Sequence, residues 1–222
     1  SELTCFSFDP IKNITCGEGG AVVTSNQELA GKMASRRVLG IVRDAASYAW
    51  SYTVAEHGFR YHMDNLNAAI GLEQMKRFDA FCKRRRAIAS RYDEAFAGIP
   101  GLSRREQRLD ETCPFFYVVR VLDGRREVLI DHLKASGIMT GVHYVPNHLH
   151  RLFADRRTFL PVAERLGREI LTLPLFYEMT DEQVEFVIAA VRRFFLGASH
   201  VVSMASKGRR EAATQQPLRG DL

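Results

Sequence analysis

Two short apolar segments near the start of the chain enclose a polar stretch rich in glycine. Residues 4–8 and 21–24 carry aromatic and β-branched side chains, and one proline and three glycines lie between them. Short runs of this kind, bounded by proline and glycine, are typical of strands. The pattern predicts two strands joined by a long turn, and it places Lys12 on that turn.

Helical spacing of apolar residues begins after the second segment. It predicts a helix over 27–37, for which Asn26 is a suitable N-terminal cap. Residues 41–57 show no clear period and predict a long, hairpin-like loop. A second helical pattern begins near Asp64 and extends to about residue 97, with an interruption expected at 78–82.

The remainder of the chain alternates between strand and helix patterns, which predicts a small α/β domain. A capping box at Thr180-Asp181-Glu182-Gln183 indicates the start of the last helix. From residue 199 onward the periodicity is lost and small polar residues dominate, which predicts a disordered tail. The expected elements are strands over 115–122 and 138–144, helices over 125–136, 161–170 and 181–195, a loop over 103–112 and an extended segment over 173–175.

The composition is that of an ordinary globular protein. Of the 222 residues, 46% are hydrophobic and 26% are charged. No apolar run approaches the roughly 20 residues that span a bilayer, and the chain does not open with a signal peptide. These features lead us to expect a cytoplasmic protein that does not enter a membrane.

The formal net charge of +5 suits an enzyme that handles phosphate-bearing ligands. No zinc-finger spacing, aromatic RNA-binding signature or helix-turn-helix pattern accompanies it, so we expect no nucleic-acid partner. The four cysteines show no metal or disulfide spacing and are expected to be reduced thiols. The histidines of the His143–His150 segment suggest a metal, but Pro146 breaks any helix there and no carboxylate is placed as a further ligand, so we expect none.

Lys12 is the first candidate for chemistry. A lysine held by a stiff local frame can act as a nucleophile toward a carbonyl group. A lysine on a turn is more often a solvated surface charge, and the position alone does not decide between the two roles.

The whole string from Ser7 to Gly20, followed by Val22-Val23-Thr24, resembles the Schiff-base segment of the DegT/StrS-type sugar aminotransferases, which use pyridoxal 5′-phosphate (PLP). The resemblance implies that Lys12 anchors PLP, that Ser7 contacts its phosphate and that Asn13 lies at the cofactor. Asp9 departs from the family pattern, which often has His at this position.

The string from Gly58 to Leu72 resembles a second segment of the same family. There, the middle residue of a Gly-aromatic-x-aromatic sequence reaches the PLP phosphate of the neighbouring subunit, which implies a homodimer. That residue is commonly Asn and is Arg60 here, and a guanidinium pairs well with phosphate. The alternative is that Arg60 points to solvent. His62 replaces a family Arg, and its role is open.

The segment His143-Tyr144-Val145-Pro146 resembles a family segment at the mouth of the active site. By this resemblance Tyr144 and His148 are candidate substrate contacts. The alternative is that these loop residues only bond to one another.

The resemblance implies the C-terminal part of a fold-type I PLP-dependent aminotransferase. Residues 1–80 would be a remnant of the large PLP-binding domain, 81–198 a small α/β domain and 199–222 a disordered tail. The family's N-terminal part supplies a phosphate clamp, an aromatic that stacks on the pyridine ring and an Asp for the ring nitrogen, and this chain does not contain it.

The implied reaction is transamination of a nucleotide-linked keto-sugar, with glutamate as amino donor, in amino-sugar biosynthesis. A dehydratase branch of the family has His in place of the lysine, and Lys12 argues against that branch. A non-catalytic half-enzyme that acts as a regulatory or interaction domain is the remaining alternative.

Overall fold

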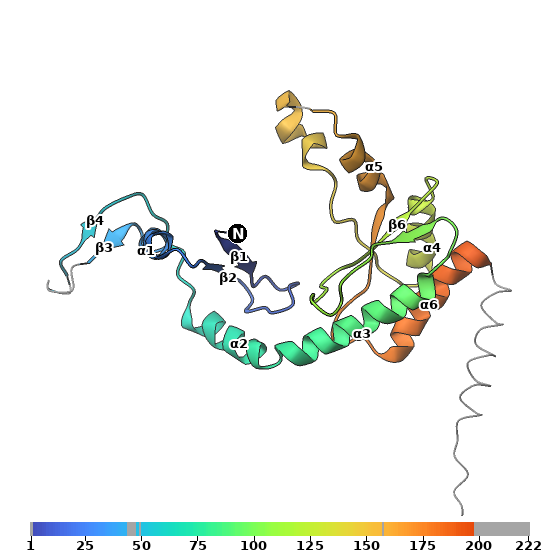
Figure 1. Ribbon diagram of the computed structural model, residues 1–222, viewed down its shortest axis with the longest axis horizontal. Helices are drawn as coiled ribbons and strands as arrows, with labels where there is room; N and C mark the ends of the chain where they lie inside the picture. Colours follow the sequence, from blue (N-terminus) through green and yellow to red (C-terminus); the bar gives the residue numbers. More distant parts are fainter. Residues whose placement is uncertain (1, 44–47, 49, 157, 198–222) are drawn as a thin grey trace, which may run out of the picture. The chain divides into compact units, whose positions relative to one another are not determined.

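The computed structural model describes residues 2–43, 48, 50–156 and 158–197. The chain forms two compact units, residues 1–81 (unit 1) and residues 82–222 (unit 2), and the division falls within helix α3 (Phe78–Phe96). The elements of both units are labelled in Figure 1.

Unit 1 opens with a hairpin. Strand β1 (Thr4–Ser7) pairs antiparallel with β2 (Gly20–Val23), with Thr4 opposite Val23 and Ser7 opposite Gly20. The two strands predicted from the apolar segments are confirmed.

Helix α1 (Gln27–Arg36) follows the hairpin, and its predicted cap is confirmed. The side chain of Asn26 accepts hydrogen bonds from the backbone N–H groups of Glu28 at 3.0 Å and Leu29 at 3.1 Å. Such a cap satisfies donors that the first turn of a helix leaves without partners. Strands β3 (Ile41–Val42) and β4 (Thr53–Val54) then form a short antiparallel hairpin within the predicted loop.

Helix α2 (Asn65–Lys76) is capped by Asp64, which accepts from the N–H of Asn67 at 2.8 Å. The helix ends at Lys76, Arg77 is its C-cap, and α3 begins at Phe78. The predicted interruption is therefore present, but it lies just before the interval 78–82.

Unit 1 contains almost no apolar core. Among its described residues, the buried apolar side chains are those of Cys16 and Phe81, and neither α1 nor α2 has a buried residue. All four residues of β1 are exposed.

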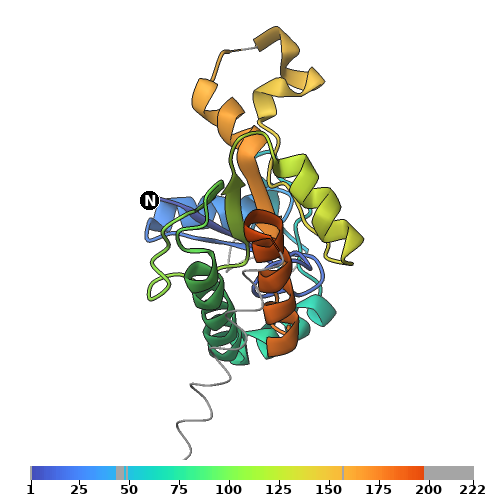
Figure 2. The ribbon, with the colours of Figure 1, turned by 90° about the vertical axis from the view of Figure 1, so that its right-hand side faces the viewer.

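Unit 2 is built on a three-stranded sheet with the order β5-β6-β7, in which every pairing is antiparallel. Figure 2 shows helices α3 and α6 side by side in this unit. Its strands are β5 (Leu102–Arg104), β6 (Tyr117–Val121) and β7 (Ile170–Leu173), and its further helices are α4 (Arg126–Ala135), the 3₁₀ turns η1 (Asn147–Leu149) and η2 (Arg151–Arg156), α5 (Pro161–Glu169) and α6 (Asp181–Leu196).

The core of unit 2 is continuous across its sheet and helices. Alternate residues of β6 are buried, as expected for a strand with one face on a core. Polar groups also link its elements: the hydroxyl of Tyr92 donates to the carbonyl of Pro174 at 3.0 Å, and that of Tyr117 donates to Asp93 at 2.8 Å. The largest fully buried side chains are Tyr92, Tyr117, Phe96, Ile88, Leu129, Leu133, Leu171, Leu173, Val119, Val121, Val184 and Val191.

The predicted strand over 138–144 is wrong. Only Gly141 pairs, in an isolated bridge with Thr172. The ring of His143 folds back onto Gly141, where a Cβ atom would lie 2.5 Å from the ring. The ring of His143 hydrogen-bonds to Thr172 Oγ1, and the backbone pairing at Gly141 does not extend into a strand.

Two further boundaries differ from the predictions. The charged segment 103–112 was expected to be a loop, but its first two residues belong to β5, whose partner β6 is distant in sequence. The helix expected over 161–170 ends at Glu169, and Ile170 begins β7.

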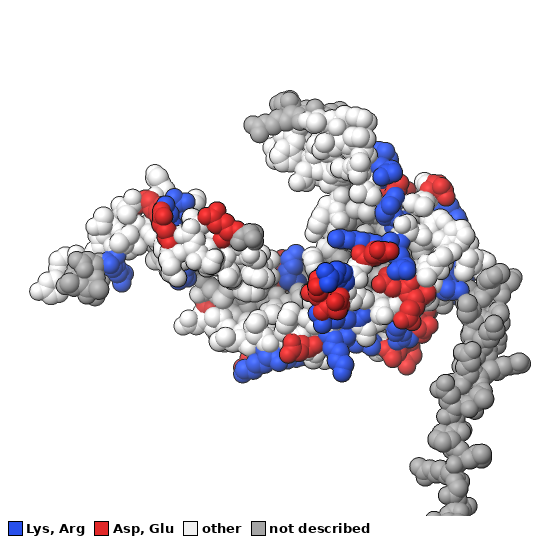
Figure 3. Space-filling view, in the orientation of Figure 1, with Lys and Arg blue, Asp and Glu red and all other residues white. Residues whose placement is uncertain are grey.

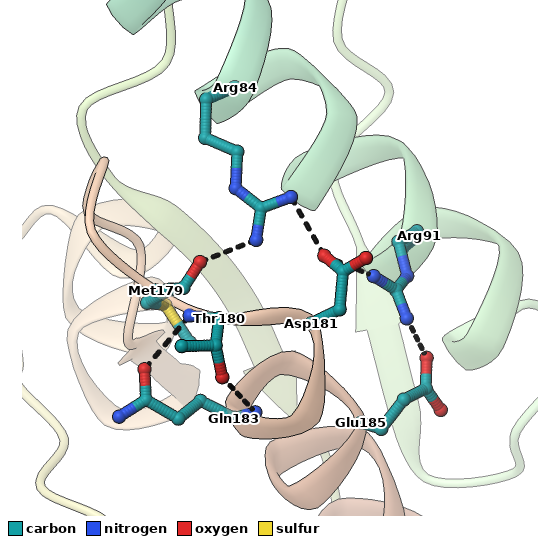
Figure 4. A network of polar contacts seen from close by, with 7 residues as sticks. All are labelled: Arg84, Arg91, Met179, Thr180, Asp181, Gln183 and Glu185. Carbon is teal, nitrogen blue, oxygen red and sulfur yellow. Dashed lines mark hydrogen bonds and ion pairs between the residues drawn. The ribbon is translucent and has the colours of Figure 1, made fainter.

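The start of α6 is held by two sets of polar contacts (Figure 4). Thr180 Oγ1 accepts from the N–H of Gln183 at 3.2 Å, and Gln183 Oε1 accepts from the N–H of Thr180 at 3.0 Å, which confirms the predicted capping box. Arg84 donates to Asp181 at 2.8 Å, and Arg91 reaches the same carboxylate at 2.9 Å. The hydrogen bond from Arg84 holds the pKa of Asp181 below its ordinary value.

The predicted disordered tail, residues 199–222, lies outside the described residues. Within the part of the chain that the structure describes, no helix has both the length and the apolar character needed to cross a membrane.

We predict that Thr180→Ala lowers the free energy of unfolding of unit 2 by about 1 kcal/mol, because it removes the side-chain half of the capping box. Thr180→Ser keeps the hydroxyl and should retain most of the stability. Urea unfolding followed by circular dichroism measures both. Equal stability of the Ala variant and the wild-type chain would contradict the role assigned to this cap.

Candidate active site

The connection between β1 and β2 is ordered by its own hydrogen bonds. The N–H of Phe8 donates to the carbonyl of Gly19 at 2.9 Å, and the carbonyl of Phe8 accepts from both Cys16 N–H and Thr15 Oγ1 at 3.1 Å. Thr15 Oγ1 also accepts from the N–H of Gly17 at 3.0 Å. The loop is thus closed at its base, and residues 9–14 project from a fixed frame.

A turn within this loop carries Lys12. The carboxylate of Asp9 accepts from the N–H of Ile11 at 3.0 Å, and the backbone N–H of Lys12 donates to the carbonyl of Asp9, also at 3.0 Å. The side chain of Lys12 is half-buried. Asp9, which departs from the family pattern, therefore acts as the residue that shapes the turn.

Ser7, Lys12 and Asn13 lie on this one loop. Ser7 is exposed at its start, where its hydroxyl accepts from the N–H of Asp9 at 3.4 Å, and Asn13 is half-buried beside Lys12. A primary amine can bond covalently to an aldehyde, and a hydroxyl and an amide can donate to phosphate oxygens. This donor set fits PLP, which carries both an aldehyde and a phosphate.

Arg60 lies on an extended segment that is fixed through its backbone. The N–H of Phe59 donates to the carbonyl of Arg36 at 2.7 Å, and Arg60 forms a bridge with Val38. The rings of Phe59 and Tyr61 stack with their centroids 5.2 Å apart. Because side chains alternate along an extended segment, the exposed guanidinium of Arg60 points away from that stack.

The close approach of this segment to the end of α1 depends on Gly58. A Cβ atom at this position would lie 2.1 Å from the backbone nitrogen of Gly40, so no larger residue fits without a shift of the backbone. His62, a few residues further on, lines a hollow of about 630 Å³ together with Ser35 and Ile41.

Tyr144 and His143 lie in unit 2. Tyr144 is exposed, and its ring meets that of His143 edge-on with the centroids 5.0 Å apart. His143 in turn stacks on Phe116 at 4.3 Å and bonds to Thr172 Oγ1 at 2.9 Å. The ring of His143, which is itself fixed by Phe116 and Thr172, therefore packs against the ring of Tyr144. The sequence alone did not indicate this role.

His148 has a partner within its own unit. Its Nε2 lies 3.2 Å from Oε1 of Glu164, and both side chains are largely covered, with 12% and 19% exposed. The same carboxylate oxygen accepts from the N–H of Leu160 at 3.3 Å. The hydrogen bond from His148 lowers the pKa of Glu164. This contact favours the alternative in which the loop histidine bonds to its neighbours, whereas Tyr144 remains open to solvent.

Among the residues that the structure describes, no group of three His, Cys, Asp or Glu side chains is placed to hold a metal ion. The same residues include four cysteines, all of them free thiols.

A sequence model of the DegT/DnrJ/EryC1/StrS aminotransferase family matches residues 1–192. The chain belongs to this family. The aminotransferases of this family are PLP-dependent, and the solved relatives include sugar aminotransferases.

Curated relatives and solved structures support the assignment. The spore coat polysaccharide biosynthesis protein SpsC of Bacillus subtilis is 36% identical over 212 residues, which cover 89% of this chain and 54% of SpsC. The sugar aminotransferase CalS13 of Micromonospora echinospora superposes with a TM-score of 0.79 at 32% identity and 86% coverage of this chain. DesV of S. venezuelae, solved with a ketimine intermediate, superposes with the same TM-score at 34% identity and 87% coverage.

These neighbours have the architecture of fold-type I PLP-dependent aminotransferases, which confirms the predicted fold class. The chain covers 51% of CalS13 and 52% of DesV. It therefore spans about half the length of the relatives that it matches.

We predict that His148→Ala raises the pKa of Glu164 toward its ordinary value, because the variant removes the hydrogen bond that favours the charged carboxylate. The exposed His150 is a matched control, and His150→Ala should leave this pKa unchanged. An NMR titration of the Glu164 carboxyl carbon measures the shift. Because the folded-state pKa is lowered, the bond contributes stability above the unfolded pKa, and the contribution is lost as the pH falls through the folded pKa. A Glu164 pKa that is the same in wild type and His148→Ala would exclude this pairing.

Proposed function

We propose that this chain is the C-terminal part of a PLP-dependent aminotransferase that places an amino group on a nucleotide-linked keto-sugar, with glutamate as the amino donor. Family membership and the printed name of SpsC, a polysaccharide biosynthesis protein, support a role in amino-sugar formation. The observation that carries the proposal is the position of Lys12, a half-buried residue on a loop ordered by its own hydrogen bonds. We place the reaction in the cytoplasm, where the four free thiols would stay reduced.

Lys12 has two roles in the proposed reaction. Its Nζ anchors the cofactor covalently, and once released by the amino donor it moves a proton to or from the reacting carbon of the substrate. PLP, when bound, supplies the carbonyl that accepts amino groups and the electron sink that stabilises the carbanion. The short turn shaped by Asp9 restricts where the amine can reach, which is the positioning that proton transfer requires.

Three further residues of unit 1 are proposed to hold the cofactor. Ser7 and Asn13 are close to Lys12 in the same loop, with a hydroxyl and an amide that can donate to the phosphate. Arg60, whose side chain is exposed on a segment with a fixed backbone, is proposed to reach the phosphate bound by the partner subunit of a homodimer. A guanidinium can bind two phosphate oxygens at once.

Tyr144 and His148 are proposed substrate contacts in unit 2. Tyr144 offers an exposed hydroxyl on a ring supported by His143, which suits hydrogen bonding to a sugar. His148 can contact a substrate through its second ring nitrogen, Nδ1, while its Nε2 is held by Glu164.

A non-catalytic half-enzyme of the same fold is the second candidate. It is favoured by one specific observation: among the described residues of unit 1, the only buried apolar side chains are those of Cys16 and Phe81. In this alternative the chain would bind a partner without turning over a substrate.

We predict that Lys12 is the lysine that bonds to PLP in the complete enzyme containing this chain. Borohydride reduction after incubation with PLP, followed by peptide mapping, should place the label on Lys12, and Lys12→Arg should abolish it. Label on Lys76, Lys83 or Lys134 with none on Lys12 would reject the proposed function. A complete enzyme that takes up no label at all would favour the half-enzyme.

We predict that Arg60→Ala weakens PLP binding by the complete homodimer roughly tenfold to a hundredfold, since a charge-assisted hydrogen bond contributes about 1.5–3 kcal/mol. Arg60→Lys should retain part of the affinity, and Arg43→Ala, which alters another exposed arginine of unit 1, should retain all of it. Titration of the apoenzyme with PLP measures the three variants. Unchanged affinity in Arg60→Ala with an intact dimer would remove Arg60 from the site.

A further inference from the structure

Two of the free thiols lie beside one another in unit 2. Cys82 is near the start of α3 and is 5% exposed, whereas Cys113 is half-buried on the loop between β5 and β6. A hydrogen bond joins the two side chains. The contact therefore links two segments of unit 2 that are distant in the sequence.

The loop that carries Cys113 is fixed against α3. Thr112 closes a turn with Arg108, whose carbonyl accepts from the N–H of Thr112 at 3.0 Å and from its hydroxyl at 2.9 Å. The carbonyl of Thr112 in turn accepts from Nε of Arg86 at 2.8 Å. Because residues i and i+4 of a helix share one face, Arg86 holds the loop on the face of α3 that presents Cys82. Hydrogen bonds of neighbouring residues thus keep the two sulfurs together.

A buried cation accompanies the pair. In Figure 3, charged side chains of both signs are interspersed on the surface over α3 and α6, whereas Arg85 of α3 is only 8% exposed. One of its terminal nitrogens donates to the carbonyl of Leu175 at 3.1 Å, and its Nε is buried without a hydrogen-bond partner among the described residues.

The charge of Arg85 acts on the two thiols. Burial lowers the pKa of Arg85, and the nearby Cys113, Glu178 and Cys82 oppose this shift, because negative charge on these groups favours the guanidinium. The effect is mutual, so the guanidinium favours a thiolate at its side. The thiolate is the form of cysteine that reacts with oxidants.

The two thiols have different roles in this arrangement. Burial, and then the hydrogen bond with Cys82, raises the pKa of Cys113 to about 12. A hydrogen bond raises the pKa of a thiol when it favours the protonated form, so Cys113 is the donor and the sulfur of Cys82 is the acceptor. Of the two sulfurs, Cys82 is therefore the one that can carry negative charge while Cys113 keeps its proton.

We propose that Cys82 and Cys113, activated by the buried Arg85, are a redox-active pair that closes a reversible disulfide in the presence of hydrogen peroxide. The thiolate of Cys82 attacks one peroxide oxygen, the O–O bond breaks, and the hydroxide that leaves takes up a proton to become water. The sulfur of Cys113 then attacks the sulfenic acid on Cys82, gives up its proton, and a second water leaves. The two thiols together supply the two electrons that reduce one peroxide to two waters.

The contact makes this step geometrically accessible. Sulfurs in hydrogen-bond contact need only a small side-chain rotation to reach the S–S bond length of about 2.05 Å. The bridge ties the start of α3 to the loop that enters β6, and a dithiol reverses it by thiol–disulfide exchange. The proposal rests on contacts within unit 2 and does not require the proposed aminotransferase reaction.

The test uses the whole 222-residue chain, treated in its folded state with one equivalent of hydrogen peroxide, blocked with N-ethylmaleimide and digested with trypsin. Cleavage after lysine and arginine places the two thiols on separate peptides, residues 78–83 and residues 109–120. Mass spectrometry should find these peptides joined with the loss of two hydrogens, and dithiothreitol should separate them.

Variants identify the groups that take part. Cys82→Ser and Cys113→Ser should each abolish the bridge, whereas Cys5→Ser, which removes an exposed thiol of unit 1, is the matched control and should leave it unchanged. Arg85→Met should slow the loss of free thiols at least tenfold, and Lys83→Met, which removes an exposed charge from the same helix, should not. Circular dichroism checks the folding of each variant, and the cysteine variants decide the bridge even if Arg85→Met does not fold.

Three results would overturn the proposal. The first is oxidation of either thiol to a sulfinic acid without a bridge between them. The second is a disulfide that joins two chains, seen as a dimer in non-reducing electrophoresis. The third is an equal rate of thiol loss in folded Arg85→Met and in the wild type.

Discussion

The burial of apolar side chains is distributed unevenly along this chain, and the rest of the structure depends on that distribution. The continuous core lies between Ile88 and Val191, where β6 and three helices exclude water from a set of large side chains. Among residues 2–43, 48 and 50–81, two apolar side chains are buried, those of Cys16 and Phe81. Unit 2 can therefore be stabilised by its own packing, whereas unit 1 by itself relies mainly on local hydrogen bonds.

The candidate chemistry lies in the unit that packs least. The turn that carries Lys12 is nonetheless well specified, because its hydrogen bonds run between residues close in the sequence, from Phe8 to Gly19. Local bonds of this kind can form without a core, but they hold the amine only relative to its own loop. The groups that an aminotransferase needs around the cofactor must be fixed relative to that loop, and this requires the apolar contacts that unit 1 lacks by itself.

The sequence predicted the features that depend on neighbours in the chain. The caps Asn26 and Thr180, the first hairpin and the position of Lys12 on its turn all follow from short patterns. The features that it missed are set by distant contacts. Gly141 pairs only with Thr172, so the expected strand over 138–144 does not form, and β5 exists because β6 lies beside it.

The candidate site divides in the same way. Ser7, Lys12 and Asn13 lie within one short sequence motif, so the sequence alone could assign them to one site. The structure adds that Asp9 shapes the turn that carries Lys12. The contact between His148 and Glu164 joins two segments with no shared pattern, and only the fold of unit 2 brings them together.

Amide hydrogen exchange on the intact chain, followed by mass spectrometry, tests the central claim most directly. Amides in β6 and α6 should be protected by about a thousandfold or more, and those in β1, α1 and α2 by roughly tenfold or less, because only the former are covered by a core. Comparable strong protection in both units would show that unit 1 is stable by itself and would contradict the account.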